Sequence, residues 1–275
     1  MPAKAMSENT FADIFEKYFY VIRADTPQLK LLAYRIRYDV YCREFQYEEP
    51  NPEHIETDHF DDHSMHCLLI HKPTGTAAGC VRLIDSRKLV DKHLPFEPFF
   101  KNYGNSRYFR LIDPNTLRRG NYGEISRLAV RSSFRRRKIE KHAPISYPIT
   151  SEAHDLGRNS TLVMPISLVL AAFVLQFSCG FDYGFAMMEM RLVRLLNRYG
   201  IRFMQVGDLV NYHGRRGPFC IHEDLMRRHF KPEIRELMAV MKEQLSAKPY
   251  HAPVQALPFR LQSDFYPHRM RRHQV

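Results

Sequence analysis

The order of apolar segments is the feature that most limits the fold of this chain. The runs His66–His71 and Ala77–Ile84 flank Pro73-Thr74-Gly75, which is typical of a β-hairpin. Further strands are expected at Phe19–Ile22, Glu124–Val130, Tyr183–Met188, Ile201–Val210 and Pro218–His222. Helices are expected at Phe11–Tyr18, Leu29–Phe45, Pro165–Cys179, Glu189–Tyr199 and Pro232–Ser246. Because hairpins join antiparallel strands, this order predicts an α/β fold with a single mixed, largely antiparallel sheet flanked by helices.

The length allows one large domain or two small ones, and the composition favours one large domain followed by a tail. The chain has 275 residues, which is enough to bury a substantial core. Residues 1–246 are expected to form this domain. Residues 247–275 contain Pro258, Pro267 and several Arg and His, so they are expected to be a basic, flexible C-terminal tail.

The formal net charge of +11 favours acidic partners such as nucleic acid, anionic lipid or an acidic carrier protein. Arg269, Arg271 and Arg272 make a nucleic-acid-binding module one alternative, but no helix-turn-helix, zinc-finger or RRM signature accompanies them. The five cysteines are scattered and never in CxxC spacing, which argues against a disulfide framework and suits a reducing cytosol.

One segment approaches the length that crosses a bilayer. Leu162–Phe181 is nearly all apolar, but it contains Pro165, Gln176 and Gly180, so a buried core helix is the better interpretation. Met1–Asp13 lacks the apolar centre of a signal peptide. The sequence therefore predicts a cytoplasmic protein, with contact to a membrane surface through the basic tail as a further expectation.

Charged residues inside otherwise apolar elements point to a site. Arg37 lies in the first long predicted helix, and Arg82 and Arg127 lie in predicted strands. A buried charge is unfavourable unless it is paired, so these arginines are expected to meet the acids Asp58, Asp61 and Glu124. Any one such residue fits a surface ion pair. Four segments of this kind in one order favour a shared functional site.

The same segments resemble a known family. The order R-x-x-V-[FY], E-x-D-x-[FY]-D, x-R-L and E-x-S-R-[FL]-x-V is similar to that of the acyl-homoserine-lactone synthases, whose fold is GNAT-like. These patterns are read at Arg37–Tyr41, Glu56–Asp61, Val81–Leu83 and Glu124–Val130. In the second half, Met188-Glu189-Met190-Arg191-Leu192, Arg198-Tyr199-Gly200-Ile201 and Tyr212-His213-Gly214 with Pro218 resemble the N-acyl amino acid synthases. The likeness is closer still to the acyltransferases of PEP-CTERM/exosortase systems, and it spans Tyr20 to His222.

The resemblance implies an N-acyltransferase that moves a fatty acyl group from a thioester to the amine of an amino acid or similar small acceptor. Acyl-homoserine-lactone synthesis is an alternative. The lactone enzymes usually carry a tryptophan after the first helix, whereas this chain has no tryptophan and places Phe45 or Tyr47 there. This difference favours the amino acid acceptor.

Acyl transfer needs a base for the amine, donors for the thioester carbonyl and a held acceptor. Glu124, Ser126 and Arg127 are the predicted catalytic residues, with Glu124 as the base whose pKa burial would raise. The predicted substrate-binding residues are Arg37, Tyr41, Asp58, Asp61, Arg82, Leu128 and Ala129. An arginine would hold an acceptor carboxylate, and the aspartates would position the arginines or bind an amino group. By resemblance to GNAT enzymes, the N–H groups of Leu128 and Ala129 would bind the thioester carbonyl.

A geometric condition follows from the spacing of two of these residues. On a regular strand, Glu124 and Arg127 point to opposite faces. If both serve one site, a β-bulge must lie between Glu124 and Val130.

The segment after this strand bears on the donor. Most coenzyme-A-using GNAT proteins have a glycine-rich loop here, whereas residues 131–138 are basic and contain no glycine. The segment is therefore predicted to bind an acidic acyl carrier protein, with coenzyme A left open as a donor. The predicted contacts are Arg131, Arg135, Arg136, Arg137 and Lys138. No permanent cofactor is expected, and the helix Pro165–Cys179 is a candidate wall for an acyl tunnel.

A metal-dependent hydrolase is the remaining alternative. It is suggested by the crowding of Asp58, His59, Asp61, Asp62, His63 and His66. The acids already match pairing positions of the resembling family, so no metal is expected.

Overall fold

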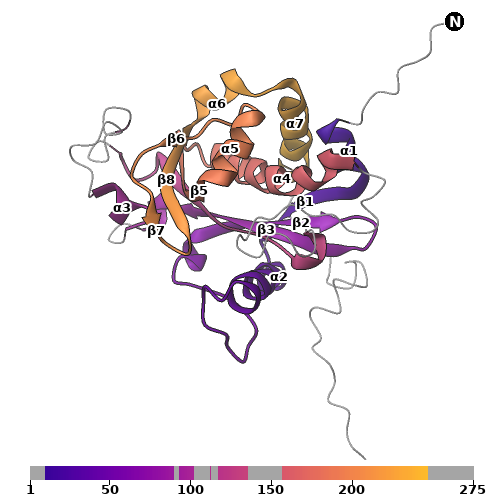
Figure 1. The fold of residues 1–275 in the computed structure, drawn as a ribbon, viewed down its shortest axis with the longest axis horizontal. Coiled ribbons are helices and arrows are strands. Elements are labelled where there is room, and N and C mark those ends of the chain that lie inside the picture. The colour runs from indigo at the N-terminus through magenta and orange to yellow at the C-terminus, as the bar shows by residue number, and fades with distance from the viewer. Residues whose placement is uncertain (1–9, 90–92, 102–111, 113–116, 136–156, 247–275) are drawn as a thin grey trace, which may run out of the picture.

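The chain is described as a computed structural model over residues 10–89, 93–101, 112, 117–135 and 157–246 (Figure 1). Within these ranges eight strands form one sheet in the order β1-β2-β3-β4-β5-β8-β6, and β7 also pairs with β8. The strands are β1 Phe19–Arg23, β2 Ser64–His71, β3 Thr76–Asp85, β4 Tyr122–Val130, β5 Tyr183–Glu189, β6 Met204–Gln205, β7 Val210–Asn211 and β8 Arg215–His222. Only β4 and β5 pair in parallel, so the predicted mixed and largely antiparallel sheet is confirmed.

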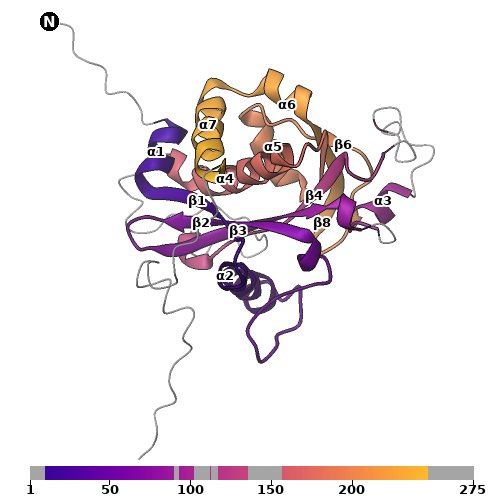
Figure 2. The same cartoon turned by 180° about the vertical axis from the view of Figure 1, so that it is seen from behind.

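Helices cover both faces of this sheet. They are α1 Phe11–Tyr18, α2 Pro27–Arg37, α3 Glu97–Lys101, α4 Gly157–Ser178, α5 Met190–Arg198, α6 Glu223–His229 and α7 Pro232–Ser246. The two opposite views show α2 on one face and α1, α4, α5 and α7 on the other (Figures 1 and 2). The central helix α4 is buried from Val163 to Leu175, which matches the predicted core helix. Among the described residues, no helix has the length and apolar character needed to cross a membrane.

The first long helix differs from its prediction. The expected single helix Leu29–Phe45 divides into α2 and a π-helix, Tyr38–Glu44, which α2 leads into directly. The N–H of Phe45 donates to the carbonyl of Val40, five residues back, at 3.0 Å. Because the wider turn admits an extra residue, helical spacing alone could not place Tyr41 correctly.

Two further differences lie near the C-terminal end of the sheet. The expected strand Ile201–Val210 is reduced to the short strands β6 and β7, because a bend around Gly207 and Asp208 separates them. Helix α6 was not predicted. By contrast, α7 has the predicted bounds, and Gly200 follows α5 with a φ of +80°, as expected of a helix stop. The predicted tail, residues 247–275, lies outside the described residues.

The pairing of β4 with β5 ends early. The parallel register joins Tyr122, Gly123 and Glu124 to Tyr183, Gly184 and Phe185 and goes no further among the described residues. Strand β5 nevertheless continues along β8 as far as Glu189. The two neighbouring strands therefore separate beyond Glu124, and the polar side chains of β4 lie at that opening.

Candidate active site

A β-bulge interrupts β4 between Ser126 and Ala129. In the register with β3, Arg82 lies opposite Ser126 and Cys80 lies opposite Ala129, so β4 uses one residue more than β3 over this step. Arg127 has a φ of +52°, in the left-handed region that non-glycine residues seldom occupy. The predicted bulge is confirmed. It changes the alternation of side chains, and both Glu124 and Arg127 line one cavity.

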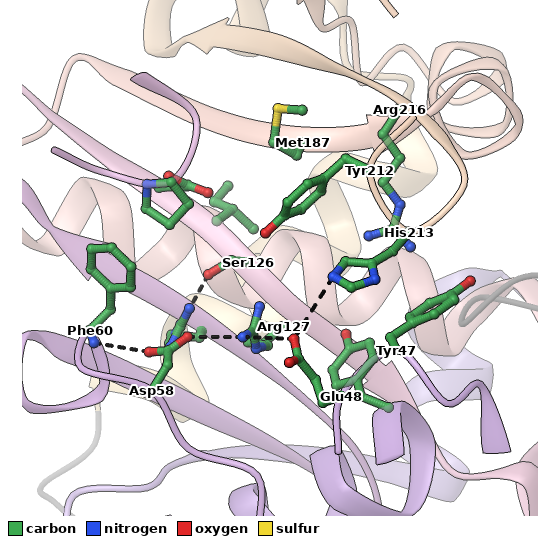
Figure 3. A pocket seen from close by; sticks show the side chains of 15 residues that line it. Tyr47, Glu48, Asp58, Phe60, Ser126, Arg127, Met187, Tyr212, His213 and Arg216 are labelled. Atoms are coloured by element: carbon green, nitrogen blue, oxygen red, sulfur yellow. Dashed lines mark hydrogen bonds and ion pairs between the residues drawn. The ribbon is translucent and has the colours of Figure 1, made fainter. Parts of the chain in front are cut away.

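This cavity has a volume of about 300 Å³ (Figure 3). Its walls come from the π-helix and the loop after it, from β3 and β4, from β5, and from the β7–β8 hairpin. The lining residues are Tyr41, Tyr47, Glu48, Asp58, Phe60, Arg82, Pro95, Glu124, Ile125, Ser126, Arg127, Met187, Tyr212, His213 and Arg216. The cavity thus collects charged and aromatic side chains from distant parts of the sequence.

Beneath the cavity lies a buried network that begins at Arg37. Its side chain is fully buried and donates from Nε to Glu56. Its other two nitrogens donate to the two carboxylate oxygens of Asp61, at 2.6 and 3.0 Å. Burial alone would raise the pKa of Asp61, but the hydrogen bonds and charges of Arg37 and Arg82 hold it below its usual range.

Arg82 and Arg127 extend the same network toward the cavity. Arg82 donates from Nη1 to Asp58 at 2.6 Å and to Asp61 at 2.9 Å. Arg127 donates from Nη2 to Asp58 at 2.9 Å and from Nε to Glu56 at 3.1 Å. Three guanidinium groups therefore balance three carboxylates, which satisfies the pairing expected for buried charges.

The network separates the predicted binding residues into two groups. Asp58 and Arg82 line the cavity, so the substrate-binding role predicted for them stays open to test. Arg37 and Asp61 do not line it, and both are fully engaged with their ion-pair partners. Both residues lie beneath the cavity and hold other members of the network, and Asp61 positions Arg37 and Arg82. A direct contact of Arg37 or Asp61 with a substrate stays a prediction. Glu56 was absent from the predicted site residues, although it begins the pattern that contains Asp58 and Asp61.

Glu124 is set apart from these ion pairs. Its side chain is buried, and its Oε2 accepts a hydrogen bond from the N–H of Phe96 at 3.0 Å. Burial raises the pKa of Glu124 to about 8, although the Phe96 N–H and the Arg82 charge act in the opposite direction. The direction predicted from the sequence is confirmed, and the carboxyl is mostly protonated at neutral pH.

This raised pKa predicts a pH dependence of stability. Between about pH 4.5 and pH 8, the folded state holds a proton on Glu124 that the unfolded state has released. The free energy of unfolding should therefore fall with rising pH in this window, by about 1.4 kcal/mol per pH unit at most. We expect Glu124→Gln to be more stable than the wild type at pH 9, and nearly equal to it at pH 4.5. Urea unfolding of both proteins at three pH values measures this, and parallel pH profiles would contradict it.

The β7–β8 hairpin and the loop after the π-helix form a wall that the sequence prediction missed. The His213 ring contacts the Tyr47 ring at a centroid distance of 4.9 Å, and its Nε2 lies 3.9 Å from Glu48. The Arg216 guanidinium lies 5.6 Å from the Tyr47 ring and 3.5 Å from Glu189. In Figure 3, His213 points toward Glu48. The motif Tyr212-His213-Gly214 is part of the family resemblance noted in the sequence, but the resemblance assigns no function to its individual residues.

Part of the chain is similar to a family of known proteins. Residues 36–143 match the family model described as the acetyltransferase (GNAT) domain. This part of the chain is of the GNAT acyltransferase type. The match includes the network, the bulge and the basic segment after β4. No curated protein sequence is a significant match to the chain.

Solved structures show the same fold. TofI in a ternary complex with an inhibitor and MTA matches with a TM-score of 0.51 and 16% identity, over 78% of this chain and 99% of that chain. BjaI, a CoA-dependent acyl-homoserine lactone synthase with SAM and isopentyl-CoA, matches with a TM-score of 0.51 and 15% identity, over 86% and 95%. FeeM, an N-acyl amino acid synthase from uncultured soil microbes, has a TM-score of 0.47 and 12% identity, over 77% and 94%. At these identities the likeness of the first two concerns the fold, which is GNAT-like as predicted.

Within the GNAT domain, the remaining predicted residues lie close to the bulge. Ser126 lines the cavity, and its Oγ accepts from Arg82 Nε at 3.0 Å. Tyr41 also lines the cavity, and its hydroxyl donates to the carbonyl of Leu128 at 2.8 Å. Leu128 and Ala129 are not among the cavity-lining residues. Their proposed role toward the thioester carbonyl stays a prediction.

The basic segment after β4 is engaged with acids of the π-helix. Arg135 is buried, pairs with Glu44 and lies over the Phe45 ring at 5.1 Å, and burial lowers its pKa to about 10. Arg131 lies 3.9 Å from Asp39. The charge of Arg135 is therefore partly neutralised by Glu44, and its role in docking a carrier protein stays a prediction. Arg136, Arg137 and Lys138 lie outside the described residues.

Two other expectations concern α4 and a metal. No side chain of α4 lines the cavity among the residues of that helix whose side chains are described, so this cavity does not correspond to the predicted tunnel. Over the described ranges, no group of three or more His, Cys, Asp or Glu side chains is arranged to hold a metal ion. Asp58 and Asp61 bind arginines instead, and His66 Nε2 lies 3.7 Å from Asp61.

Proposed function

We propose that this GNAT domain transfers a fatty acyl group from a phosphopantetheine thioester to the amine of an amino acid or similar small acceptor. The observation that carries the proposal is the placement of Glu124 and Arg82 in one cavity at the opening between β4 and β5. A buried carboxyl and a buried guanidinium there supply the two functions that an amine with a carboxylate requires.

The charges of the cavity wall suit an acceptor carboxylate. Arg82, Arg127 and Arg216 line the cavity, against the two carboxylates of Glu48 and Asp58 when Glu124 is protonated. The wall then has an excess of one positive charge. In addition, Nη2 of Arg82 is buried without a hydrogen-bond partner among the described residues. A ligand carboxylate would satisfy this donor.

Glu124 suits the proton transfer that amide formation needs. A base works best when its pKa lies near the operating pH, and burial brings Glu124 to about 8. The amine would bind with its nitrogen toward this carboxylate. Ser126 can still donate its hydroxyl hydrogen into the cavity, toward the thioester oxygen or the acceptor.

The donor is proposed to be an acyl carrier protein or coenzyme A thioester, bound as a substrate. The basic residues 136–138 favour an acidic carrier protein, although the engagement of Arg135 weakens that argument. BjaI, which shares the fold, is a CoA-dependent enzyme, so coenzyme A stays an equal candidate.

Three further parts of the proposal rest on the sequence alone. They are a cytoplasmic location, a surface contact with the membrane and an association with PEP-CTERM/exosortase systems.

Incubation of the purified protein with a pool of amino acids tests the proposal. Parallel reactions would contain acyl carrier protein or coenzyme A loaded with the same saturated acyl chain. We expect mass spectrometry to detect an N-acyl amino acid with at least one donor. Supplying S-adenosylmethionine in place of the pool tests for the lactone. Absence of an N-acyl product with every donor and acceptor would refute the proposed activity.

A further inference from the structure

The proton balance of the reaction requires more than one proton-accepting group. An amino acid acceptor enters with an ammonium group, because its amine pKa is well above neutral pH. The nitrogen loses two protons when its lone pair forms the N–C bond and the C–S pair leaves with sulfur. One proton ends on the departing thiol and the other goes to solvent. Glu124 is buried and mostly protonated at neutral pH, so it is poorly placed to release a proton to water.

A second titratable group lies on the outer wall of the same cavity. His213 occupies the tip of the β7–β8 hairpin with a φ of +47°, and 31% of its side chain is exposed. It therefore reaches both the cavity and water. Such a left-handed conformation is unfavourable for a residue other than glycine, and it often marks a functional position.

The surroundings of His213 favour a neutral ring that is held in place. Its Nε2 lies 3.9 Å from Glu48, while its ring contacts Tyr47 and Tyr212, both at a centroid distance of 4.9 Å. Burial lowers the pKa of His213; Glu48 opposes this, and the charges of Arg216 and Arg127 reinforce it. The ring is therefore unprotonated at neutral pH. It can accept a proton, and the Glu48 carboxylate stabilises the resulting imidazolium.

We propose that His213, oriented by Glu48, accepts the first proton of the acceptor ammonium and passes it to solvent. This inference rests on the proposed acyl transfer. The freed lone pair then attacks the thioester carbonyl, and the second nitrogen proton passes through the ionised Glu124 to the departing thiolate. The sum is ammonium plus thioester giving amide, thiol and one released proton. Glu124 and His213 thus act on different protons of the same nitrogen.

The test compares His213→Asn with His54→Asn. Asparagine tolerates positive φ, so the backbone conformation is retained. His54 is a matched control, because it has a φ of +55° and stacks on Tyr38 at 5.2 Å but does not line the cavity. At pH 7, with the amino acid that gives the most product, we expect His213→Asn to lower kcat/KM by about 10²-fold. His54→Asn should retain the wild-type rate.

A nucleophile that enters uncharged, and so has no ammonium proton to lose, separates this first proton transfer from a structural role. Hydroxylamine is uncharged at pH 7, so its acylation should be slowed much less by His213→Asn than acylation of the amino acid. The deficit with the amino acid should also shrink as the pH approaches the pKa of its amine. Equal loss with both nucleophiles at every pH, or no loss with either, would overturn the inference. If the wild type acylates hydroxylamine but no amino acid, the proposed acceptor class fails instead.

The pairing with Glu48 gives an independent check. If the two residues act as a unit, the double variant Glu48→Gln with His213→Asn should be no slower than His213→Asn alone. Additive losses would contradict the orienting role of Glu48. Thermal unfolding of Glu48→Gln, His213→Asn, their double variant and His54→Asn against the wild type confirms that the rates compare folded proteins.

Discussion

Glu124→Gln is expected to lower the rate of N-acyl product formation at pH 8 by about 10²- to 10⁴-fold, the range for loss of a positioned acid–base group. Glutamine keeps the shape of the side chain and can still accept the hydrogen bond from the Phe96 N–H. It cannot take a proton from the tetrahedral intermediate. The change therefore removes the chemistry and leaves the cavity wall in place.

The pH profile separates this role from a general disturbance. In the wild type, kcat should rise with pH and level off above about 8, where Glu124 is ionised. The residual rate of Glu124→Gln should lack this step. Steady-state rates from pH 6 to pH 10, with Glu124→Asp as a variant that keeps an ionisable carboxyl, provide the measurement. A wild-type rate in folded Glu124→Gln would remove Glu124 from the mechanism.

The second large effect concerns stability. Arg37→Met should lower the free energy of unfolding by about 3–5 kcal/mol, because two buried carboxylates each lose one of their two guanidinium partners. Glu56 would retain only Arg127, and Asp61 would lose a two-point contact. Arg37→Lys should also destabilise, since one ammonium cannot reproduce three N–H donors in this planar arrangement.

The control for this prediction is Arg43→Met. Arg43 pairs with Asp39 at 3.4 Å, but its side chain is 67% exposed, so its removal should change the unfolding free energy by less than about 1 kcal/mol. Urea titrations of the variants at pH 7 measure both effects. Combining Arg37→Met with Asp61→Asn should cost less than the sum of the two single changes, because the second removes a carboxylate that the first leaves with Arg82 as its remaining arginine partner. Equal stability of Arg37→Met and Arg43→Met would contradict the proposed importance of the network.

The sequence predicted those parts of the site that depend on strand spacing and on the pairing of buried charges. The spacing of Glu124 and Arg127 required a bulge if both serve one cavity, and the bulge is present. The rule that buried charges are paired anticipated contacts between the arginines and the acids of Asp58–Asp61. The same rule could not state which arginine faces the cavity, since Arg37 and Arg82 are equally buried.

The other wall of the cavity could not have been found in this way. Glu48 and His213 are far apart in the sequence, and they meet only because β8 lies beside β5 and the strands beyond Glu124 separate. The π-helix is equally hidden, because its residues have ordinary helical spacing, whereas Tyr41 within it makes a long-range hydrogen bond to Leu128 that spacing does not reveal. Long-range topology decided both features.

The bulge in β4 also settles how the strand packs. Ile125 and Val130 belong to one core cluster and Ala129 to the cluster on the other face. On an unbroken strand, Ile125 and Val130 would point in opposite directions, because they are an odd number of positions apart. Straightening β4 would therefore turn apolar side chains away from the core as well as dispersing the polar ones. The same core packing that stabilises the fold therefore fixes the positions of Glu124 and Arg127 before any substrate binds.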